Sequence, residues 1–328
     1  MGLELDAVDE EYSQVLVMGG LGFIGSHLCR SLVKARHKVR IFDKRYCSRD
    51  LIGDIRDEVE IEEGDIERPE DVLQALRGID VVVDLIHTTV PGSSMEDPGY
   101  DVQSNIVSHV RWLSLLKDTD VRRIVYISSG GTVYGIPLNN PISEDHPTEP
   151  ICSYGISKLT IEKYVAMYAD IGGIEYRICR PGNVYGEGQR LSIGQGVIGV
   201  FLESALKGMP VEIWGSGNVK RDYLYVKDLV TGILKVMNHS GKKRVFNIST
   251  GVGHSLNDIV RIIRDEVNIP LQVNYKEIRK FDVPISILDN NRIREETGWA
   301  PKTNIIEGIR RVLDWLRDGE IRSGLKAT

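Results

Sequence analysis

Residues 15–28 read Val15-Leu16-Val17-Met18-Gly19-Gly20-Leu21-Gly22-Phe23-Ile24-Gly25-Ser26-His27-Leu28, and this stretch decides the fold. A short apolar run predicts a buried strand, a glycine turn follows, and the later apolar spacing is helical. Gly19 permits the tight turn, Gly22 lets the backbone approach a pyrophosphate, and Gly25 brings helix and strand together. The helix N-terminus then offers free N–H groups to the anion. The stretch predicts a phosphate-binding loop, to which Phe23 and Ile24 also belong.

The alternation of apolar runs and helical patterns continues outward from this stretch. Repeated βα alternation predicts an α/β fold, a Rossmann-type doubly wound parallel sheet. The segments with a strand pattern are Gln14 to Met18, Lys38 to Phe42, Val59 to Glu63, Asp80 to Ile86, Arg123 to Ser128 and Glu175 to Cys179. The segments with helical periodicity are Ser26 to Ala35, Pro69 to Leu76, Asp101 to Leu116 and Tyr154 to Asp170.

An acidic residue marks the end of the second predicted strand. Asp43 lies roughly twenty residues beyond the glycine turn, where a carboxylate accepts hydrogen bonds from the adenosine ribose hydroxyls. The same carboxylate repels a 2′-phosphate, so the sequence favours NAD over NADP. The adjacent Lys44 and Arg45 keep NADP open, because basic side chains could hold a phosphate. Asp65 and Ile66 follow the third strand; Asp65 either reaches the adenine edge or caps the next turn.

The composition and the pattern of the sequence change after about residue 180. Glycines crowd Pro181 to Gly199, and the helical and strand patterns become shorter. We expect residues 1–180 to form an NAD-binding domain and residues 181–328 to form a smaller C-terminal substrate-binding region. Val245 to Ser249 again has a strand pattern, within a segment near 222–255 that we expect to return to the sheet. The two regions would therefore interleave.

Composition restricts the classes of function. The 328 residues are 41% hydrophobic and 27% charged, with a net charge of −6, which argues against nucleic-acid binding. No apolar stretch approaches the roughly 18 residues that span a bilayer, and the acidic N-terminus is unlike a signal peptide. The four cysteines are widely spaced, which favours reduced thiols over disulfides or a metal site. We expect a cytoplasmic protein without a membrane partner.

A candidate proton-transfer pair lies in Cys152-Ser153-Tyr154-Gly155-Ile156-Ser157-Lys158. Residues four apart share a helix face, so the Lys158 ammonium can favour the phenolate of Tyr154. A tyrosine of pKa about 10 needs on the order of 4 kcal/mol of electrostatic help to act as a base near pH 7. One lysine and a cationic nicotinamide ring could supply it. Such pairs are common on helix surfaces, so this pair alone is weak evidence for catalysis. The glycine loop and Asp43 in the same chain strengthen that interpretation.

Together these motifs resemble the extended short-chain dehydrogenase/reductase family, in particular its nucleotide-sugar epimerases and dehydratases, with the UDP-glucose 4-epimerases most similar. The resemblance covers nearly the whole chain after residue 13. It implies NAD as cofactor, a UDP-sugar as substrate, and a homodimer formed through the helices Asp101 to Leu116 and Tyr154 to Asp170, where Val165 and Met167 offer apolar surface. The further motifs that carry it are Gly64-Asp65-Ile66, Asn105, Thr132-Val133-Tyr134-Gly135, Arg180-Pro181-Gly182-Asn183-Val184-Tyr185-Gly186 and Arg221-Asp222-Tyr223-Leu224-Tyr225-Val226.

The resemblance also implies residue roles. Tyr154 would be the acid/base and Lys158 would bridge the nicotinamide ribose, with Asn105 and Ser128 also in the cofactor site. In the substrate site, Asn183 would touch the sugar nucleotide and Arg221 would pair with its diphosphate. Arg279 and Asp282 match an Arg-x-x-Asp that grips the diphosphate and the uridine ribose. Fork-shaped guanidinium donors suit a diphosphate, although either arginine taken alone would favour a surface ion pair.

Two positions depart from the family pattern. The family commonly has a Ser or Thr four residues before the tyrosine of Val-Tyr-Gly, bonding the reacting sugar hydroxyl, and here that residue is Gly130. Ser129, a water or, preferably, Thr132 would replace it. The second departure is Asp84-Leu85-Ile86-His87-Thr88-Thr89-Val90-Pro91, where epimerases usually show His-Leu-Ala-Ala. His87 is either a second proton relay or, preferably, a hydrogen-bonded histidine at a strand end.

Further along, Ser286 falls where these epimerases place a residue that gates the C2 substituent of the sugar. A small serine suggests room for N-acetylhexosamines as well as glucose and galactose. The resemblance implies reversible inversion at C4 through a 4-keto sugar, with NAD regenerated in place. The alternatives are a nucleotide-sugar 4-ketoreductase, a 4,6-dehydratase, which usually needs Asp-Glu where Gly131-Thr132 stands here, and a catalytically quiet NAD-binding regulatory protein.

Overall fold

The computed structural model describes residues 14–191, 196–267, 270–277 and 283–326. Seven parallel strands form the main sheet in the order β10-β6-β5-β4-β1-β2-β3. The predicted α/β fold with a doubly wound parallel sheet is confirmed. The strands are β1 (Gln14–Met18), β2 (Lys38–Asp43), β3 (Val59–Glu63), β4 (Val81–Asp84), β5 (Arg123–Ile127), β6 (Glu175–Pro181) and β10 (Val245–Ile248).

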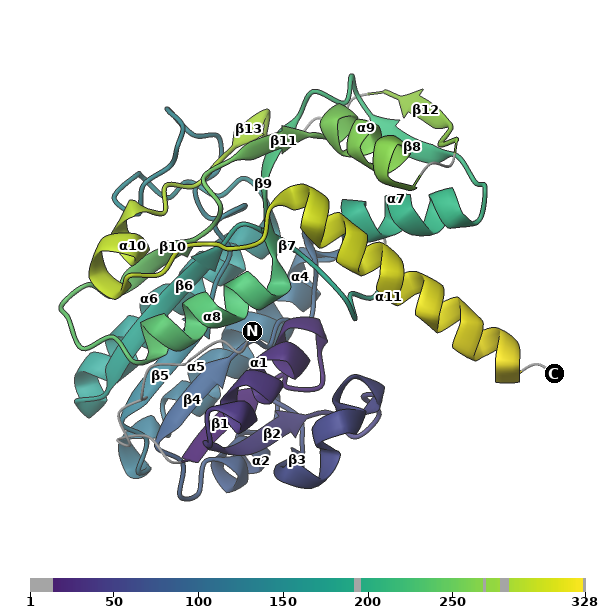
Figure 1. Ribbon diagram of the computed structural model, residues 1–328. Coiled ribbons are helices and arrows are strands. Elements are labelled where there is room, and N and C mark those ends of the chain that lie inside the picture. Colours follow the sequence, from purple (N-terminus) through teal and green to yellow (C-terminus); the bar gives the residue numbers. More distant parts are fainter. Residues whose placement is uncertain (1–13, 192–195, 268–269, 278–282, 327–328) are drawn as a thin grey trace.

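Helices cover both faces of this sheet, so its strands are apolar on both sides. Val15 and Val17 of β1 pack into one core with α1 and α8, while Leu16 and Met18 pack into a second core with α2, α5 and α6. In Figure 1, α1 and α8 lie in front of the sheet, and α2, α5 and α6 lie behind it. The bounds are α1 (Phe23–Lys34), α2 (Pro69–Ala75), α5 (Ser108–Leu113), α6 (Ser153–Gly172) and α8 (Val226–Met237).

A smaller region with its own core, built partly from Phe201, Tyr223 and Ile259, stands above the carboxyl ends of the strands (Figure 1). Strand β9 pairs with β7, β11 and β13, and β8 pairs with β12. Between these small strands the chain returns to the main sheet as β10. The bounds are β7 (Asn183–Tyr185), β8 (Val211–Trp214), β9 (Lys220–Tyr225), β11 (Gly253–Ser255), β12 (Val273–Lys276), β13 (Ile285–Ser286), α7 (Val197–Leu206), α9 (Leu256–Val267) and α11 (Ile305–Lys326).

Several short elements were not anticipated. The predicted helix from Asp101 begins earlier, at Pro98, and its middle part is π-helical. The predicted strand Asp80 to Ile86 is shorter, ending at Asp84, and the segment after it forms a short helix. These elements are η1 (Asp50–Glu58), α3 (Pro91–Glu96), α4 (Pro98–Asp101), the π-helical η2 (Val102–Val107), η3 (Leu116–Asp118) and α10 (Asn291–Thr297).

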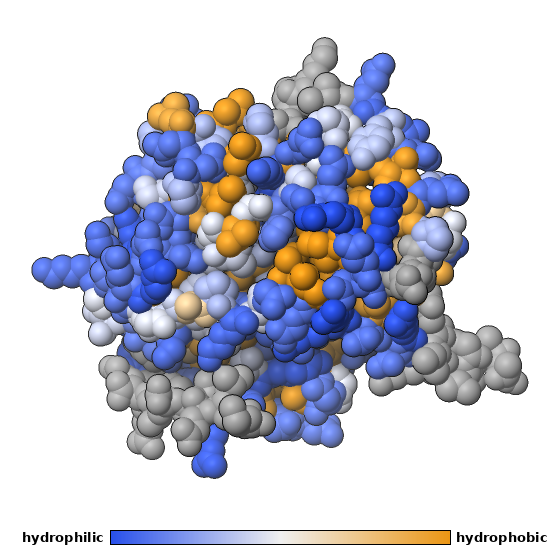
Figure 2. Space-filling model, turned by 45° about the horizontal axis from the view of Figure 1, so that its top comes forward, coloured by the Kyte–Doolittle hydropathy of each residue, from blue (hydrophilic) through white to orange (hydrophobic). Residues whose placement is uncertain are grey.

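The surface of α6 differs from the expectation in one respect. Val165 is fully buried in the core beneath the helix, so it offers no surface to a partner, whereas Met167 is 42% exposed. The homodimer therefore remains a prediction. Figure 2 shows one face of the molecule, where apolar patches interrupt a largely hydrophilic surface. Within the described residues, the helices are too short or too polar to cross a membrane.

Candidate active site

One large cleft gathers most of the predicted site residues. It opens at the carboxyl ends of the strands of the main sheet, with Gly19 after β1, Asp43 at the end of β2 and Ser128 after β5 among its lining residues. Its volume of about 1150 Å³ exceeds the roughly 300–1,000 Å³ of an ordinary ligand pocket. The opposite wall comes from the smaller region, including Arg221 and Tyr223 of β9. The cleft therefore has room for a cofactor and a substrate together, at the sheet edge where α/β proteins bind ligands.

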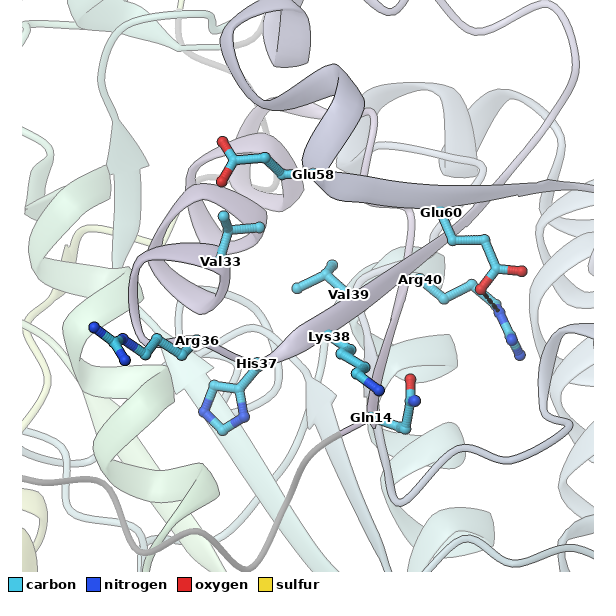
Figure 3. A pocket seen from close by; sticks show the side chains of 9 residues that line it. All are labelled: Gln14, Val33, Arg36, His37, Lys38, Val39, Arg40, Glu58 and Glu60. Atoms are coloured by element: carbon cyan, nitrogen blue, oxygen red, sulfur yellow. Dashed lines mark hydrogen bonds and ion pairs between the residues drawn. The ribbon is translucent and has the colours of Figure 1, made fainter.

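A second, shallower hollow of about 420 Å³ lies at the amino-terminal ends of β1, β2 and β3 (Figure 3). Several basic side chains line it, but Arg40 is paired with Glu60 at 2.8 Å between Nε and Oε2. None of the residues predicted for catalysis, cofactor binding or substrate binding lines this hollow. We therefore place the candidate site in the large cleft.

The glycine turn has the geometry that a pyrophosphate cradle requires. Gly19 has φ +82°, a conformation that favours glycine, and its carbonyl accepts the Gly22 N–H at 3.1 Å. A Cβ on Gly25 would lie 2.2 Å from the Gly19 oxygen, so a side chain there would push α1 off the turn. Helix α1 begins at Phe23, and Phe23 and Ile24 line the cleft. Its first N–H groups lack intrahelical partners, so these residues fit a bound pyrophosphate.

The Asp43 carboxylate ties this turn to the second strand. It lines the cleft and accepts the backbone N–H groups of Leu21 at 3.0 Å and Lys44 at 2.9 Å. Both basic neighbours face carboxylates: Lys44 Nζ is 3.0 Å from Asp65 Oδ2, and Arg45 Nε is 3.7 Å from a Glu63 oxygen. Lys44 and Arg45, the basic residues that could have held the 2′-phosphate of NADP, are thus paired with carboxylates. The arrangement fits NAD.

Two residues predicted to bind the cofactor do not line the cleft. Asp65 accepts the Glu67 N–H at 3.1 Å, so it caps the next turn, and its neighbour Ile66 reaches the cleft instead. Asn105 is fully buried, with its Oδ1 accepting the Thr88 N–H at 2.9 Å. Its side-chain amide thus hydrogen-bonds to the loop after β4 and stabilises it. The resemblance could not show this, because it does not tell which way a side chain points.

Tyr154 and Lys158 both line the cleft from the first turns of α6. The Lys158 ammonium donates to the Ile127 carbonyl at 2.9 Å and lies 5.9 Å from the centre of the Tyr154 ring. Burial lowers the pKa of Lys158 to about 8, although nearby carboxylates oppose the shift. Burial also raises the pKa of Tyr154, with smaller contributions from Cys152 and Asp101. In the polypeptide the pKa of Tyr154 is therefore shifted upward, because desolvation disfavours the phenolate, and the lowering by Lys158 together with a bound nicotinamide ring stays a prediction.

The departure at Gly130 has a steric cause. A Cβ there would meet Leu288 Cδ1 at 2.4 Å and two backbone carbonyl oxygens, those of Arg180 and Pro181, at 3.0 Å. A serine at this position would thus point into packed atoms. Gly130 itself does not line the cleft, whereas Ser129 and Thr132 on either side do.

Thr132 is our candidate for the hydroxyl that the family pattern has, and this chain lacks, at position 130. Its Oγ1 is buried and, among the described residues, has no hydrogen-bond partner. Its backbone lies against α6, since a Cβ on Gly155 would be 2.8 Å from the Thr132 carbonyl oxygen. An unpartnered buried hydroxyl is costly unless a ligand completes it, so the position fits a reacting sugar hydroxyl.

His87 packs against Tyr154. The two ring centres are 4.6 Å apart with an interplanar angle of 73°, an edge-to-face contact. Its Nε2 lies 3.5 Å from Asp101 Oδ1, and neither ring nitrogen makes a hydrogen bond within the described part of the chain. Burial and the Lys158 charge lower its pKa to about 3. The preferred hydrogen-bonded histidine is therefore not what the structure contains; His87 is a neutral ring in contact with Tyr154.

The predicted substrate residues divide into three groups. Asn183 of β7 and Arg221 of β9 line the cleft, and Arg221 Nη1 also donates to the Val283 carbonyl at 2.6 Å. Ser286 is only 5% exposed and pairs with Arg221 in the strand register, without lining the cleft. The gating role expected of Ser286 is therefore not supported by its position. Arg279 and Asp282 lie outside the described residues.

Sequence reasoning missed most of the wall formed by the smaller region. Val197, Ile198 and Phe201 of α7 line the cleft, as do Trp214 of β8 and Tyr223 of β9. Their apolar spacing is that of ordinary core positions, and much of each segment does pack into the core of the smaller region. Only the folded arrangement separates the lining side chains from the packed ones.

The comparisons with known proteins agree with this geometry. The sequence model of the NAD-dependent epimerase/dehydratase family matches residues 15–249. A protein of Methanocaldococcus jannaschii, provisionally named a UDP-glucose 4-epimerase, is 36% identical over 307 residues, covering 93% of this chain and 98% of that one. An Escherichia coli protein named dTDP-4-dehydro-6-deoxyglucose reductase is 30% identical, covering 94% and 99%. The crystal structure of Thermotoga maritima UDP-glucose 4-epimerase with UDP-glucose superposes with a TM-score of 0.88 at 31% identity, covering 93% and 99%.

Proposed function

The chain belongs to the NAD-dependent epimerase/dehydratase family, and we propose that it interconverts the C4 epimers of a UDP-hexose. One observation carries the proposal. Tyr154, Lys158 and Thr132 line the same cleft as the glycine turn and Arg221, and the buried Thr132 hydroxyl has no hydrogen-bond partner among the described residues. One cleft thus contains an acid/base pair, a hydroxyl anchor, a cofactor cradle and a cationic side chain for a diphosphate.

The protein groups divide the proton chemistry between them. Tyr154 takes the C4 hydroxyl proton as the sugar is oxidised and returns it when the ketone is reduced. Thr132 holds the same sugar oxygen, while the Lys158 ammonium, anchored on Ile127, faces the cleft as a fixed positive charge. A bound NAD would supply a reversible hydride acceptor for C4, so no cofactor would be consumed. Inversion follows if the ketone presents its opposite face before the hydride returns.

The polypeptide supports tight holding of the nucleotide and loose holding of the sugar. Arg221 lines the cleft on a strand whose neighbours fix its backbone, and Asn183 lies on the adjacent strand. The cleft lining also includes Gly131, Pro181 and Gly182, whose side chains offer a sugar no hydrogen bond. A sugar with few strong contacts can rotate about its diphosphate, as inversion requires.

A 4-ketoreductase is the second candidate, and the relationship to the Escherichia coli protein named dTDP-4-dehydro-6-deoxyglucose reductase favours it. The same Tyr154 would then protonate a carbonyl once per turnover, with reduced cofactor consumed. The two candidates differ in what must be added. The purified protein should be incubated with UDP-glucose, UDP-galactose and their N-acetyl counterparts, without added cofactor, and the products separated chromatographically.

Interconversion without added NAD supports the epimerase. No turnover until both NADH or NADPH and a 4-keto nucleotide sugar are supplied would overturn it in favour of the reductase. Bound NAD with neither activity would favour a regulatory NAD-binding protein. The choice between hexoses and N-acetylhexosamines is read from the same reactions, since the position of Ser286 gives no support for a gate.

A further inference from the structure

Asp101 is a buried carboxylate that joins three segments beside the catalytic pair. It has no exposed surface, and it does not line the cleft. Its oxygens accept the hydroxyl of Thr89 from the loop after β4 and the side-chain amide of Asn105 from η2, the latter at 3.1 Å. Burying an ionised carboxylate is costly unless donors surround it, so these contacts are more than incidental packing.

Two further donors come from the beginning of α6. Ser153 Oγ and Ser157 Oγ donate to the same Asp101 oxygen, Oδ2, at 2.8 and 2.6 Å. Each serine directly precedes a catalytic side chain, Tyr154 in one case and Lys158 in the other. Since the serines are four residues apart, they lie on one helix face, and a single oxygen fixes the rotation of that face.

The surroundings of the tyrosine ring depend on the same carboxylate. His87, whose ring edge contacts Tyr154, lies 3.5 Å from the other Asp101 oxygen. Asn105 donates to Asp101 and accepts the Thr88 N–H, so the loop that carries His87 is held from the same point. Helix α6 and the His87 loop thus share one anchor.

We propose that Asp101 is a positioning residue, which sets the first turn of α6 and the His87 loop so that Tyr154 and Lys158 face the substrate. This inference rests on the proposed function, because that function gives Tyr154 and Lys158 their chemistry. Asp101 acts through Ser153, Ser157 and His87 and touches no reacting atom. Small displacements of an acid/base group cost up to about 10²-fold in rate, so such an anchor has a measurable effect.

The test compares Asp101→Asn with Asp97→Asn. Asp97 is exposed and caps α4, the short helix that ends at Asp101. Asparagine also caps helices, and within the described residues Asp97 forms no hydrogen bond with either serine, so the control removes a nearby charge and keeps the cap. We expect Asp101→Asn to lower kcat by about 10- to 10²-fold, with KM and NAD content within about twofold of wild type. Asp97→Asn should keep wild-type kcat. Wild-type kcat in Asp101→Asn, or a loss confined to KM, would overturn the proposal.

A double-mutant cycle tests whether the effect passes through the serines. Ser157→Ala removes one hydrogen bond but leaves the Asp101 carboxylate its donors from Thr89, Asn105 and Ser153, so it serves even if Asp101→Asn fails to fold. We expect it to lower kcat several-fold, and Asp101→Asn/Ser157→Ala to be no slower than Asp101→Asn alone. A full kcat in Ser157→Ala, or independent effects that multiply, would contradict positioning through α6.

Hydrogen exchange separates this proposal from the proposed function. Amides of residues 153–158 should exchange faster in Asp101→Asn and in Ser157→Ala than in wild type, with no change in Asp97→Asn. This measurement needs no substrate. If wild type turns over none of the nucleotide sugars, the proposed function fails while the exchange data still decide the role of Asp101. Unchanged exchange in both variants would sink the positioning role even in an active epimerase.

Discussion

The Lys158 ammonium donates to the carbonyl oxygen of Ile127, the last residue of β5, at 2.9 Å. This bond fixes the lysine across the gap between α6 and the sheet, where it has only 3% of its surface exposed. Burial in this position lowers the pKa of Lys158 to about 8. The protein thus holds a charge that costs folding free energy, and that cost depends on pH.

Replacing Lys158 tests this cost. In the unfolded chain lysine titrates near 10.4, so between pH 8 and 10.4 the unfolded state binds more protons than the folded state at this site. The free energy of unfolding of wild type should therefore rise relative to Lys158→Met as pH increases through this window, by up to about 3 kcal/mol. Urea unfolding of cofactor-free protein at several pH values measures it. A constant difference between the two proteins from pH 7 to 10 would refute the lowered pKa.

Replacing the Tyr154 hydroxyl should stop proton transfer and leave the cofactor in place. Tyr154→Phe keeps the ring that packs on His87, so the fold and the NAD content should match wild type. We expect kcat to fall by at least about 10²-fold, the usual contribution of a general acid/base. Tyr164→Phe on the same helix, whose ring stacks on Tyr168 away from the cleft, is the matched control. Comparable activity in the two variants would show that Tyr154 is not the general acid/base.

Much of the fold was predictable because its determinants are local. The glycine turn specifies its own backbone, and the apolar runs of strands buried on both faces are readable without knowledge of their neighbours. Tyr154, Lys158 and Asp43 were found for the same reason, since each follows a short motif within one βα unit. The sequence could locate these groups along the chain and at one edge of the sheet.

The remaining features depend on contacts between distant segments. Ser286 is buried because β13 pairs with β9, some distance back along the chain, and Gly130 is enclosed by Leu288 and two carbonyls. The direction of the Tyr154 pKa shift is set by desolvation, which no motif spacing reports. Asn105 and Asp65 were predicted to bind the cofactor, but neither lines the cleft, and both bond to backbone N–H groups of nearby loops. Orientation and burial, rather than residue choice, were the missing information.

The enclosure of Gly130 predicts that restoring the family's usual serine is harmful. In Gly130→Ser the new Cβ would overlap Leu288 Cδ1 and crowd two carbonyl oxygens, so we expect a loss of about 1–3 kcal/mol in the free energy of unfolding. Activity per folded molecule should not rise. The loss in the double variant Gly130→Ser/Leu288→Ala should be smaller than the sum of the losses in the two single variants if Leu288 is the obstacle. Undiminished stability with higher kcat would instead show that position 130 can supply the missing hydroxyl.

Replacing Thr132 should change activity without changing the stability of the fold. Thr132→Val is nearly isosteric, and because the buried Oγ1 has no partner among the described residues, its loss breaks no hydrogen bond within them. The free energy of unfolding should therefore stay within about 0.5 kcal/mol of wild type, or rise. The sugar oxygen, however, loses its anchor, so kcat should fall by about 10- to 10²-fold. Ser129→Ala removes the neighbouring hydroxyl in the same cleft, and comparing the two variants decides whether Thr132 or Ser129 holds the sugar oxygen. If Ser129→Ala is the slower variant and Thr132→Val is nearly normal, Ser129 is the group that holds the reacting oxygen.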